Sequence, residues 1–184
     1  STDNDRFRKS LDKCHIAYLH APLFIPELKA VAPVRKSLGV RNFFNVLGPL
    51  VNPVQPEYQM LGVYDLAMLR LYSYIYQEEN KKFSIVHSMD GYDEVSLTSQ
   101  FKVTSNNGEH LFMPEDLGFK TIAQNELYGG ETQEEAATIF RNVLNASATD
   151  AQMNVVIVNA ALGIQTIDQH KSIEECIDIA RDAL

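Results

Sequence analysis

Cysteine is scarce in this sequence of 184 residues, whose two cysteines, Cys14 and Cys176, stand near opposite ends. A disulfide framework needs more cysteines and a structural zinc site needs clustered ligands, so neither is expected. The five histidines also lack the i, i+4 spacing of a metal site on one helix. We therefore expect two reduced thiols and a cytoplasmic protein.

Long apolar runs and glycine-rich phosphate loops are absent as well. No stretch reaches membrane-spanning length, and no basic start followed by an apolar core marks a signal peptide. Neither Gly-x-x-x-x-Gly-Lys-Ser/Thr nor Gly-x-Gly-x-x-Gly occurs, and there is no Gly-x-Ser-x-Gly nucleophile turn. We expect no membrane partner, and any phosphate cradle must lie outside these residues.

The chain has fewer basic than acidic side chains. The chain has 24 acidic and 16 basic side chains and a formal net charge of −8, which argues against nucleic acid as a partner. An anionic substrate would need local Lys or Arg residues, or a bridging cation. The hydrophobic content of 45% nevertheless places the chain among globular proteins rather than disordered ones.

The C-terminal third predicts three helices, each opened by a Ser/Thr-x-x-Glu/Gln capping box at Thr132, Thr149 and Ser172. The second helix contains the apolar run 155–158, which also fits a strand, but its capping box favours a helix. The helical spacing of the first predicts a buried stripe of four residues: Ala136, Ile139, Phe140 and Val143.

The middle of the chain alternates strands and helices. We predict a strand over 58–64, a helix over 66–77 capped by Asp65, a strand over 83–87 and a hairpin of 101–104 with 109–112. This order indicates an α/β fold with a mixed sheet flanked by helices. Towards the N-terminus we predict a helix over 7–13, a strand over 16–19 and two short helices that begin at Pro26 and Pro33.

Three segments carry candidate chemistry. Residues 90–94 (Asp-Gly-Tyr-Asp-Glu) follow a predicted buried strand, where α/β sheets place ligand sites, and suit Mg²⁺; the alternative is a solvated acidic turn. His87 either joins these carboxylates around a metal or pairs with one of them. Arg35 and Arg41 can bind a carboxylate or phosphate bidentately, or they complete a helix C-terminus. Residues 45–53 form either a rigid turn or a pocket wall.

Several stretches together resemble the anthranilate phosphoribosyltransferase family. They are residues 18–24, the run 29–39 with its Arg-x-x-Leu-Gly, the run 44–53 with its Asn-x-Leu-Gly-Pro-Leu, residues 59–63 and the Asp-Gly-x-Asp-Glu of 90–94. The resemblance implies a phosphoribosyltransferase/nucleoside phosphorylase-like large domain formed by residues 1–21 and 50–184. Residues 22–49 would complete a small all-α domain, most of which, with the glycine-rich pyrophosphate loop, precedes the matched region.

The resemblance also implies a reaction and a site. Anthranilate would take the phosphoribosyl group of phosphoribosyl pyrophosphate and pyrophosphate would leave. By matching motif, Arg35 would bind the anthranilate carboxylate, Asn45 and Pro49 would wall the anthranilate pocket, and Asp93 and Glu94 would hold Mg²⁺. The family is often dimeric, so a homodimer is expected of the full-length protein, and the present chain alone is expected to be inactive.

Two other interpretations remain open. The family usually has a His-Pro pair where this chain has Ile25-Pro26, which would fit a non-catalytic paralogue that acts as a binding module. A pyrimidine nucleoside phosphorylase-like enzyme would share the architecture, but Arg35 and the run 45–52 argue against it. A substrate panel separates these alternatives.

Overall fold

Two units make up the chain in the computed structural model, which describes residues 2–18, 33, 37, 46–52 and 54–184. The first unit, Ser1–Gln55, contains helix α1 (Thr2–Cys14) and the 3-10 turn η2 (Gly48–Val51). α1 confirms the helix predicted over 7–13, but residues 16–18 have no regular structure, so the strand predicted there is wrong. The two proline-initiated helices lie almost entirely outside the described residues.

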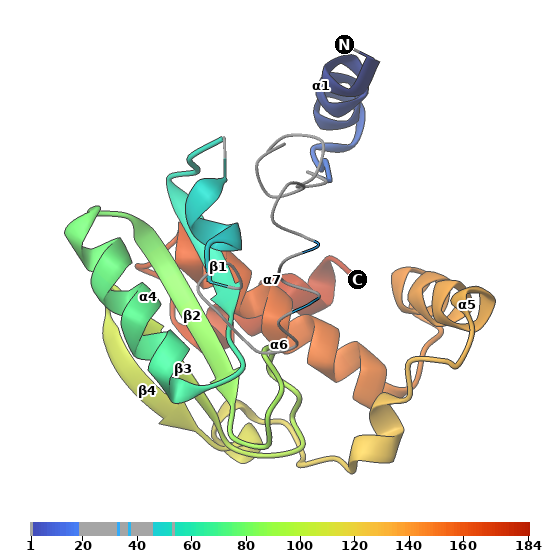
Figure 1. The fold of residues 1–184 in the computed structure, drawn as a ribbon. Coiled ribbons are helices and arrows are strands. Elements are labelled where there is room, and N and C mark those ends of the chain that lie inside the picture. The colour runs from blue at the N-terminus through green and yellow to red at the C-terminus, as the bar shows by residue number, and fades with distance from the viewer. Residues whose placement is uncertain (1, 19–32, 34–36, 38–45, 53) are drawn as a thin grey trace. The chain divides into compact units, whose positions relative to one another are not determined.

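The second unit, Pro56–Leu184, is built on a four-stranded mixed sheet in the order β1-β2-β3-β4 (Figure 1). The strands are β1 (Tyr58–Gly62), β2 (Lys82–Ser88), β3 (Phe101–Ser105) and β4 (Gly108–Phe112). β1 and β2 run parallel, and the two other pairs are antiparallel. This confirms the mixed sheet and the hairpin that the sequence predicts.

Helix α4 (Leu66–Glu78) connects the two parallel strands and covers one face of the sheet. It begins where predicted, because the Asp65 carboxylate accepts a hydrogen bond of 2.8 Å from the amide of Met68. Aromatic rings fix the helix on the sheet: the rings of Tyr76 and Phe83 lie 5.7 Å apart and both side chains are fully buried.

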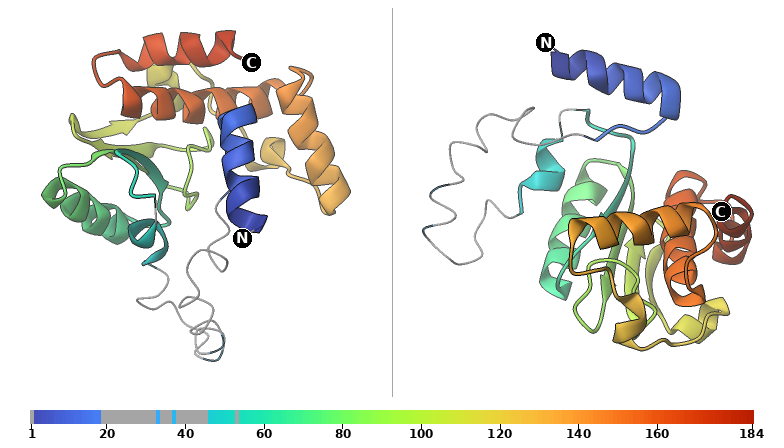
Figure 2. Two further views of the ribbon diagram at one scale, coloured as in Figure 1. Left: turned by 90° about the horizontal axis from the view of Figure 1, so that it is seen from above. Right: turned by 90° about the vertical axis from the view of Figure 1, so that its right-hand side faces the viewer.

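Helices α6 (Asp150–Ile167) and α7 (Ile173–Asp182) pack together over the opposite face (Figures 1 and 2). The run 155–158 is therefore helical, as its capping box indicates, and within it Ile157 and Val158 are buried whereas Val156 is 38% exposed. Within the described residues no helix is long and apolar enough to cross a membrane. The main core lies between this helix pair and the sheet, and it includes Val86, Val95, Phe101, Val158, Leu162 and Ile177.

Helix α5 (Gln133–Leu144) corrects one prediction about the core. Of its predicted stripe only Val143 is buried, whereas the Phe140 side chain is 64% exposed and Ala136 is exposed. The helix stands away from the sheet (Figure 1), so its apolar face does not reach the core. Periodicity predicted an amphipathic helix correctly, but it does not tell which surface covers the apolar side.

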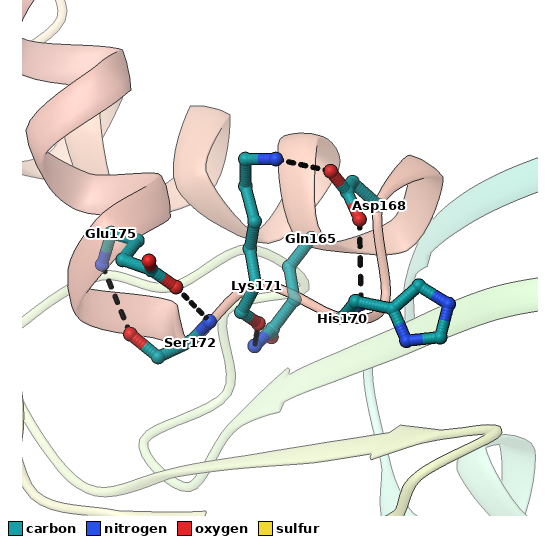
Figure 3. A network of polar contacts seen from close by, with 6 residues as sticks. All are labelled: Gln165, Asp168, His170, Lys171, Ser172 and Glu175. Carbon is teal, nitrogen blue, oxygen red and sulfur yellow. Dashed lines mark hydrogen bonds and ion pairs between the residues drawn. The ribbon is translucent and has the colours of Figure 1, made fainter.

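The loop between α6 and α7 is held by a short polar network (Figure 3). The Lys171 ammonium pairs with the Asp168 carboxylate, which also accepts a hydrogen bond of 3.4 Å from the amide of His170. The Lys171 hydrogen bond keeps the pKa of Asp168 below its ordinary value. Ser172 and Glu175 then form the predicted capping box, with reciprocal bonds of 2.8 and 3.2 Å. This loop therefore fixes where α7 begins.

The β3–β4 turn joins this loop to the start of β2 through Asn106. Its amide oxygen accepts hydrogen bonds of 2.8 Å from the Phe83 amide and from the side chain of Gln169. Its amide nitrogen donates to the Lys81 carbonyl at 2.9 Å. One side chain thus connects three segments that are distant in sequence.

We expect Asn106→Ala to lower the free energy of unfolding by about 1–3 kcal/mol, since it leaves partly buried backbone groups unpaired. Urea denaturation of the chain measures this loss. Asn107→Ala is the matched control, because among the described residues the Asn107 side chain makes a single, long hydrogen bond, of 3.3 Å, to the Gln169 carbonyl. Equal losses in the two variants would contradict the role assigned to Asn106.

Candidate metal and substrate site

The acidic loop, defined here as residues 89–96, leaves the carboxyl end of β2, where the sequence placed it. The chain reverses at once: the Ser88 amide donates to the Tyr92 carbonyl and the Gly91 amide donates to the Ser88 carbonyl, both at 2.9 Å. Gly91 has a φ of +102°, a conformation that side-chain-bearing residues rarely adopt. The loop is therefore an ordered turn at the strand end.

Hydroxyl groups hold the inside of this turn. The Ser88 hydroxyl donates to the Glu94 carbonyl at 2.7 Å and accepts from the Ser96 amide at 3.2 Å. The Asp90 carboxylate accepts hydrogen bonds from the hydroxyls of Thr98 and, at 3.4 Å, Ser96. Asp90 thus stabilises the loop itself, and Asp93 and Glu94 remain for other chemistry.

Asp93 and Glu94 are adjacent in the chain, and the carboxyl group of Asp93 acts on that of Glu94. Partial burial, the hydrogen bond to Asp93 and the negative charge of Asp93 all raise the pKa of Glu94 above its ordinary value. No lysine or arginine of the described residues forms an ion pair with either carboxylate. Two close acidic groups without a cationic side chain are a fitting donor set for a divalent cation.

The described part of the chain contains no group of three or more His, Cys, Asp or Glu residues that could hold a metal ion on its own. Mg²⁺ does not require one, since it commonly takes one or two carboxylates and completes its shell with water and substrate phosphate. The pair Asp93 and Glu94 therefore fits Mg²⁺ with a phosphate-bearing substrate better than a closed all-protein site.

The end of β1 determines how closely the acidic loop approaches the sheet. A Cβ atom on Gly62, the last residue of β1, would lie 2.2 Å from the backbone carbonyl oxygen of Asp93. Only glycine leaves room for this contact. The sequence carries only a weak signal for this role of Gly62, namely a glycine at the end of a predicted strand.

His87 does not join the acidic groups. Its ring is buried, and Nδ1 lies 2.8 Å from the carbonyl oxygen of Val63, the residue after β1. The bond connects the ends of the two parallel strands. Both interpretations made from the sequence, a metal ligand and a partner of a carboxylate, therefore give way to a structural hydrogen bond to the backbone.

A hollow of about 470 Å³ opens beside Glu94. The acidic loop forms one wall and α6 forms another, so the carboxylate stands at the edge of a mainly apolar space. Such a combination suits a ligand with one charged and one apolar part. The lining residues are Tyr92, Glu94, Val95, Ser96, Leu127, Val155, Val156, Asn159 and Ala160.

The other predicted site residues are either outside the described residues or in the first unit. Arg35 and Asn45 lie outside the described residues. Pro49 is half-buried within η2, in the first unit, whereas Asp93 and Glu94 belong to the second. The anthranilate pocket expected from Arg35, Asn45 and Pro49 therefore stays a prediction.

Comparison with known proteins shows the family to which the chain belongs. The family model described as "Glycosyl transferase family, a/b domain" matches residues 1–184, so the chain belongs to this family. The mixed sheet, with an acidic loop at the carboxyl end of one of its parallel strands, agrees with such an α/β domain.

Two curated relatives of high identity are anthranilate phosphoribosyltransferases. The chain is 58% identical over 184 residues to an anthranilate phosphoribosyltransferase of Bacteroides thetaiotaomicron, covering 100% of this chain and 55% of the relative. It is 61% identical over 180 residues to the anthranilate phosphoribosyltransferase of Bacteroides fragilis, and this match covers 98% of this chain and 54% of the relative. The chain thus spans about half the length of the curated relatives it matches.

Solved structures with a similar fold are also anthranilate phosphoribosyltransferases. The anthranilate phosphoribosyltransferase of Thermus thermophilus superposes with a TM-score of 0.87 at 30% identity, over 97% of this chain and 54% of that one. The Saccharomyces cerevisiae enzyme in complex with PRPP and Mg superposes with a TM-score of 0.72 at 23% identity, over 85% of this chain and 45% of that one. The yeast comparison supports the fold, and the Thermus comparison also supports the relationship.

Proposed function

We propose that this chain is part of an anthranilate phosphoribosyltransferase, a cytoplasmic homodimeric enzyme of tryptophan biosynthesis. The observation that carries the proposal is the 58% identity along all 184 residues to a relative of that name. Because the chain spans about half of such relatives, the activity is proposed for a protein longer than this chain. Its substrates would be anthranilate and phosphoribosyl pyrophosphate.

In this proposal Asp93 and Glu94 bind Mg²⁺ at the carboxyl end of β2. When bound, Mg²⁺ supplies positive charge that stabilises the departing pyrophosphate. The two carboxylates bring that charge to a chain whose net charge of −8 would otherwise repel a polyphosphate. The support is their mutual proximity, the raised pKa of Glu94 and the absence of a lysine or arginine partner among the described residues.

The chain would act on anthranilate by binding and orienting it. Arg35 would hold the anthranilate carboxylate through its planar guanidinium, while Asn45 and Pro49 would wall the pocket. The aryl amine is neutral at pH 7 and attacks the ribose anomeric carbon as the bond to pyrophosphate breaks. The reaction therefore depends more on alignment of the two substrates than on a strong base.

We expect the full-length protein to convert both substrates in the presence of Mg²⁺, and the purified 184-residue chain to give no turnover. The partial chain is expected to fail because residues for the pyrophosphate cradle are not among its own. Consumption of anthranilate measures the activity of both proteins, and its loss on addition of EDTA measures the requirement for Mg²⁺. Appreciable turnover by the 184-residue chain would overturn the assignment to a partial enzyme.

An anthranilate-binding measurement and a substrate panel on the full-length protein separate the alternatives. A full-length protein that binds no anthranilate would fit the non-catalytic paralogue, for which Ile25 is the motivating residue. Turnover of pyrimidine nucleosides with phosphate, and none of anthranilate, would fit the phosphorylase-like enzyme. Either result would replace the proposed function.

A further inference from the structure

A side chain from α6 holds the backbone immediately after the two acidic residues. The Asn159 amide nitrogen donates a hydrogen bond of 2.8 Å to the Val95 carbonyl, and its amide oxygen accepts one of 3.0 Å from the Val95 amide. The same nitrogen also donates to the Val155 carbonyl one turn earlier on α6, at 2.8 Å. Asn159 thus pairs with both backbone groups of one residue, as a neighbouring strand would.

Val95 is fixed at its side chain as well. It is fully buried and belongs to the core cluster between the sheet and the α6–α7 pair. On its N-terminal side, the Glu94 carbonyl accepts the 2.7 Å hydrogen bond from the Ser88 hydroxyl. The backbone that follows Glu94 is therefore held from two elements, β2 and α6, which fixes the position from which its side chain leaves the chain.

We infer that Asn159 is a positioning residue for the Asp93–Glu94 pair: by fixing Val95 it sets the geometry in which the two carboxylates bind a divalent cation. The inference rests on the metal site of the proposed function. Its physical basis is that loss of the Asn159 amide leaves the N–H and C=O of a buried residue unpaired. The loop must then shift until water or another group satisfies them.

A residue of purely structural importance would behave differently. It would lower stability while the carboxylates kept their arrangement and their affinity for metal. Metal affinity measured without substrate is the discriminating readout, because Asn159 also lines the hollow beside Glu94 and a direct effect on a bound substrate is thereby excluded. Mn²⁺ serves as the probe, since its bound and free forms are distinguished by electron paramagnetic resonance, and Mg²⁺ competes for the same site.

The test compares Asn159→Leu and Asn159→Ala with the matched control Asn154→Leu in the full-length protein. Asn154 lies on the same helix and makes no hydrogen bond to the acidic loop within the described part of the chain. We expect both Asn159 variants to bind Mn²⁺ about tenfold or more weakly, as for other residues that orient metal ligands. The control is expected to bind as the wild type does. If the leucine variant does not fold, the smaller alanine variant decides.

Hydrogen exchange at the Val95 amide accompanies the titration. Faster exchange together with weaker Mn²⁺ binding in the Asn159 variants supports the inference. Faster exchange with unchanged Mn²⁺ affinity overturns it and leaves Asn159 a structural residue. A wild-type protein that binds no Mn²⁺ is a distinct result: it removes the Asp93–Glu94 metal site from the proposed function, and this inference with it.

Discussion

The double variant Asp93→Asn/Glu94→Gln is expected to lose at least about 10²-fold in kcat/KM and to lose its response to added Mg²⁺. The substitutions keep the size and shape of both side chains but remove the two negative charges and replace one acceptor oxygen of each with a donor. Neutral amides bind Mg²⁺ far less well than carboxylates do. Initial rates measured over a range of Mg²⁺ concentrations in the full-length protein check the expectation.

The matched control is Glu78→Gln/Glu79→Gln, which removes two adjacent charges at the C-terminal end of α4. Both glutamates are exposed, and Glu79 pairs only at the surface with Lys81, at 3.3 Å. This control is expected to keep the wild-type response to Mg²⁺. An unchanged metal dependence in the Asp93/Glu94 variant would refute the two residues as ligands, whatever the change in rate.

Local signals predicted the elements that surround this site. Asp65, Thr149 and Ser172 cap helices as expected because capping depends on a few neighbouring residues and their own backbone amides. The acidic loop was placed at the end of a strand for the same reason, since strand and loop are continuous in the chain. The proximity of Asp93 and Glu94 likewise follows from their being adjacent.

Contacts between distant segments were not predictable in this way. Helical periodicity on α6 gives no indication that Asn159 meets Val95, a residue 64 positions away. The same limit explains α5, whose pattern showed an apolar face but not that Phe140 would be exposed. The domain boundaries at 21/22 and 49/50, and the roles of Arg35, Asn45 and Pro49, depend on residues or arrangements outside the described structure and stay predictions.

Gly62→Ala is expected to disturb the site through the backbone of the acidic loop. The added Cβ would overlap the Asp93 carbonyl oxygen at 2.2 Å, and a backbone atom, unlike the tip of a flexible side chain, moves only with its loop. Gly62 has no positive φ, so the backbone itself accepts alanine and the overlap is the only cost. We expect a loss of about 1–3 kcal/mol in unfolding free energy. Mn²⁺ affinity should fall by about tenfold or more.

Gly163→Ala is the matched control, since a Cβ on Gly163 of α6 meets only the Met60 sulfur at an ordinary 3.8 Å. Alanine in a helix interior should stabilise this variant by about 0.5–1 kcal/mol and leave metal binding unchanged. Indistinguishable Mn²⁺ affinities in the two glycine variants would show that the loop yields without moving its carboxylates.

Because Gly62 and Asn159 are inferred to hold one loop, the double variant Gly62→Ala/Asn159→Ala should lose less affinity than the two single losses combined. If the two affinity losses instead add in the double variant, Gly62 and Asn159 act on the metal site independently of each other.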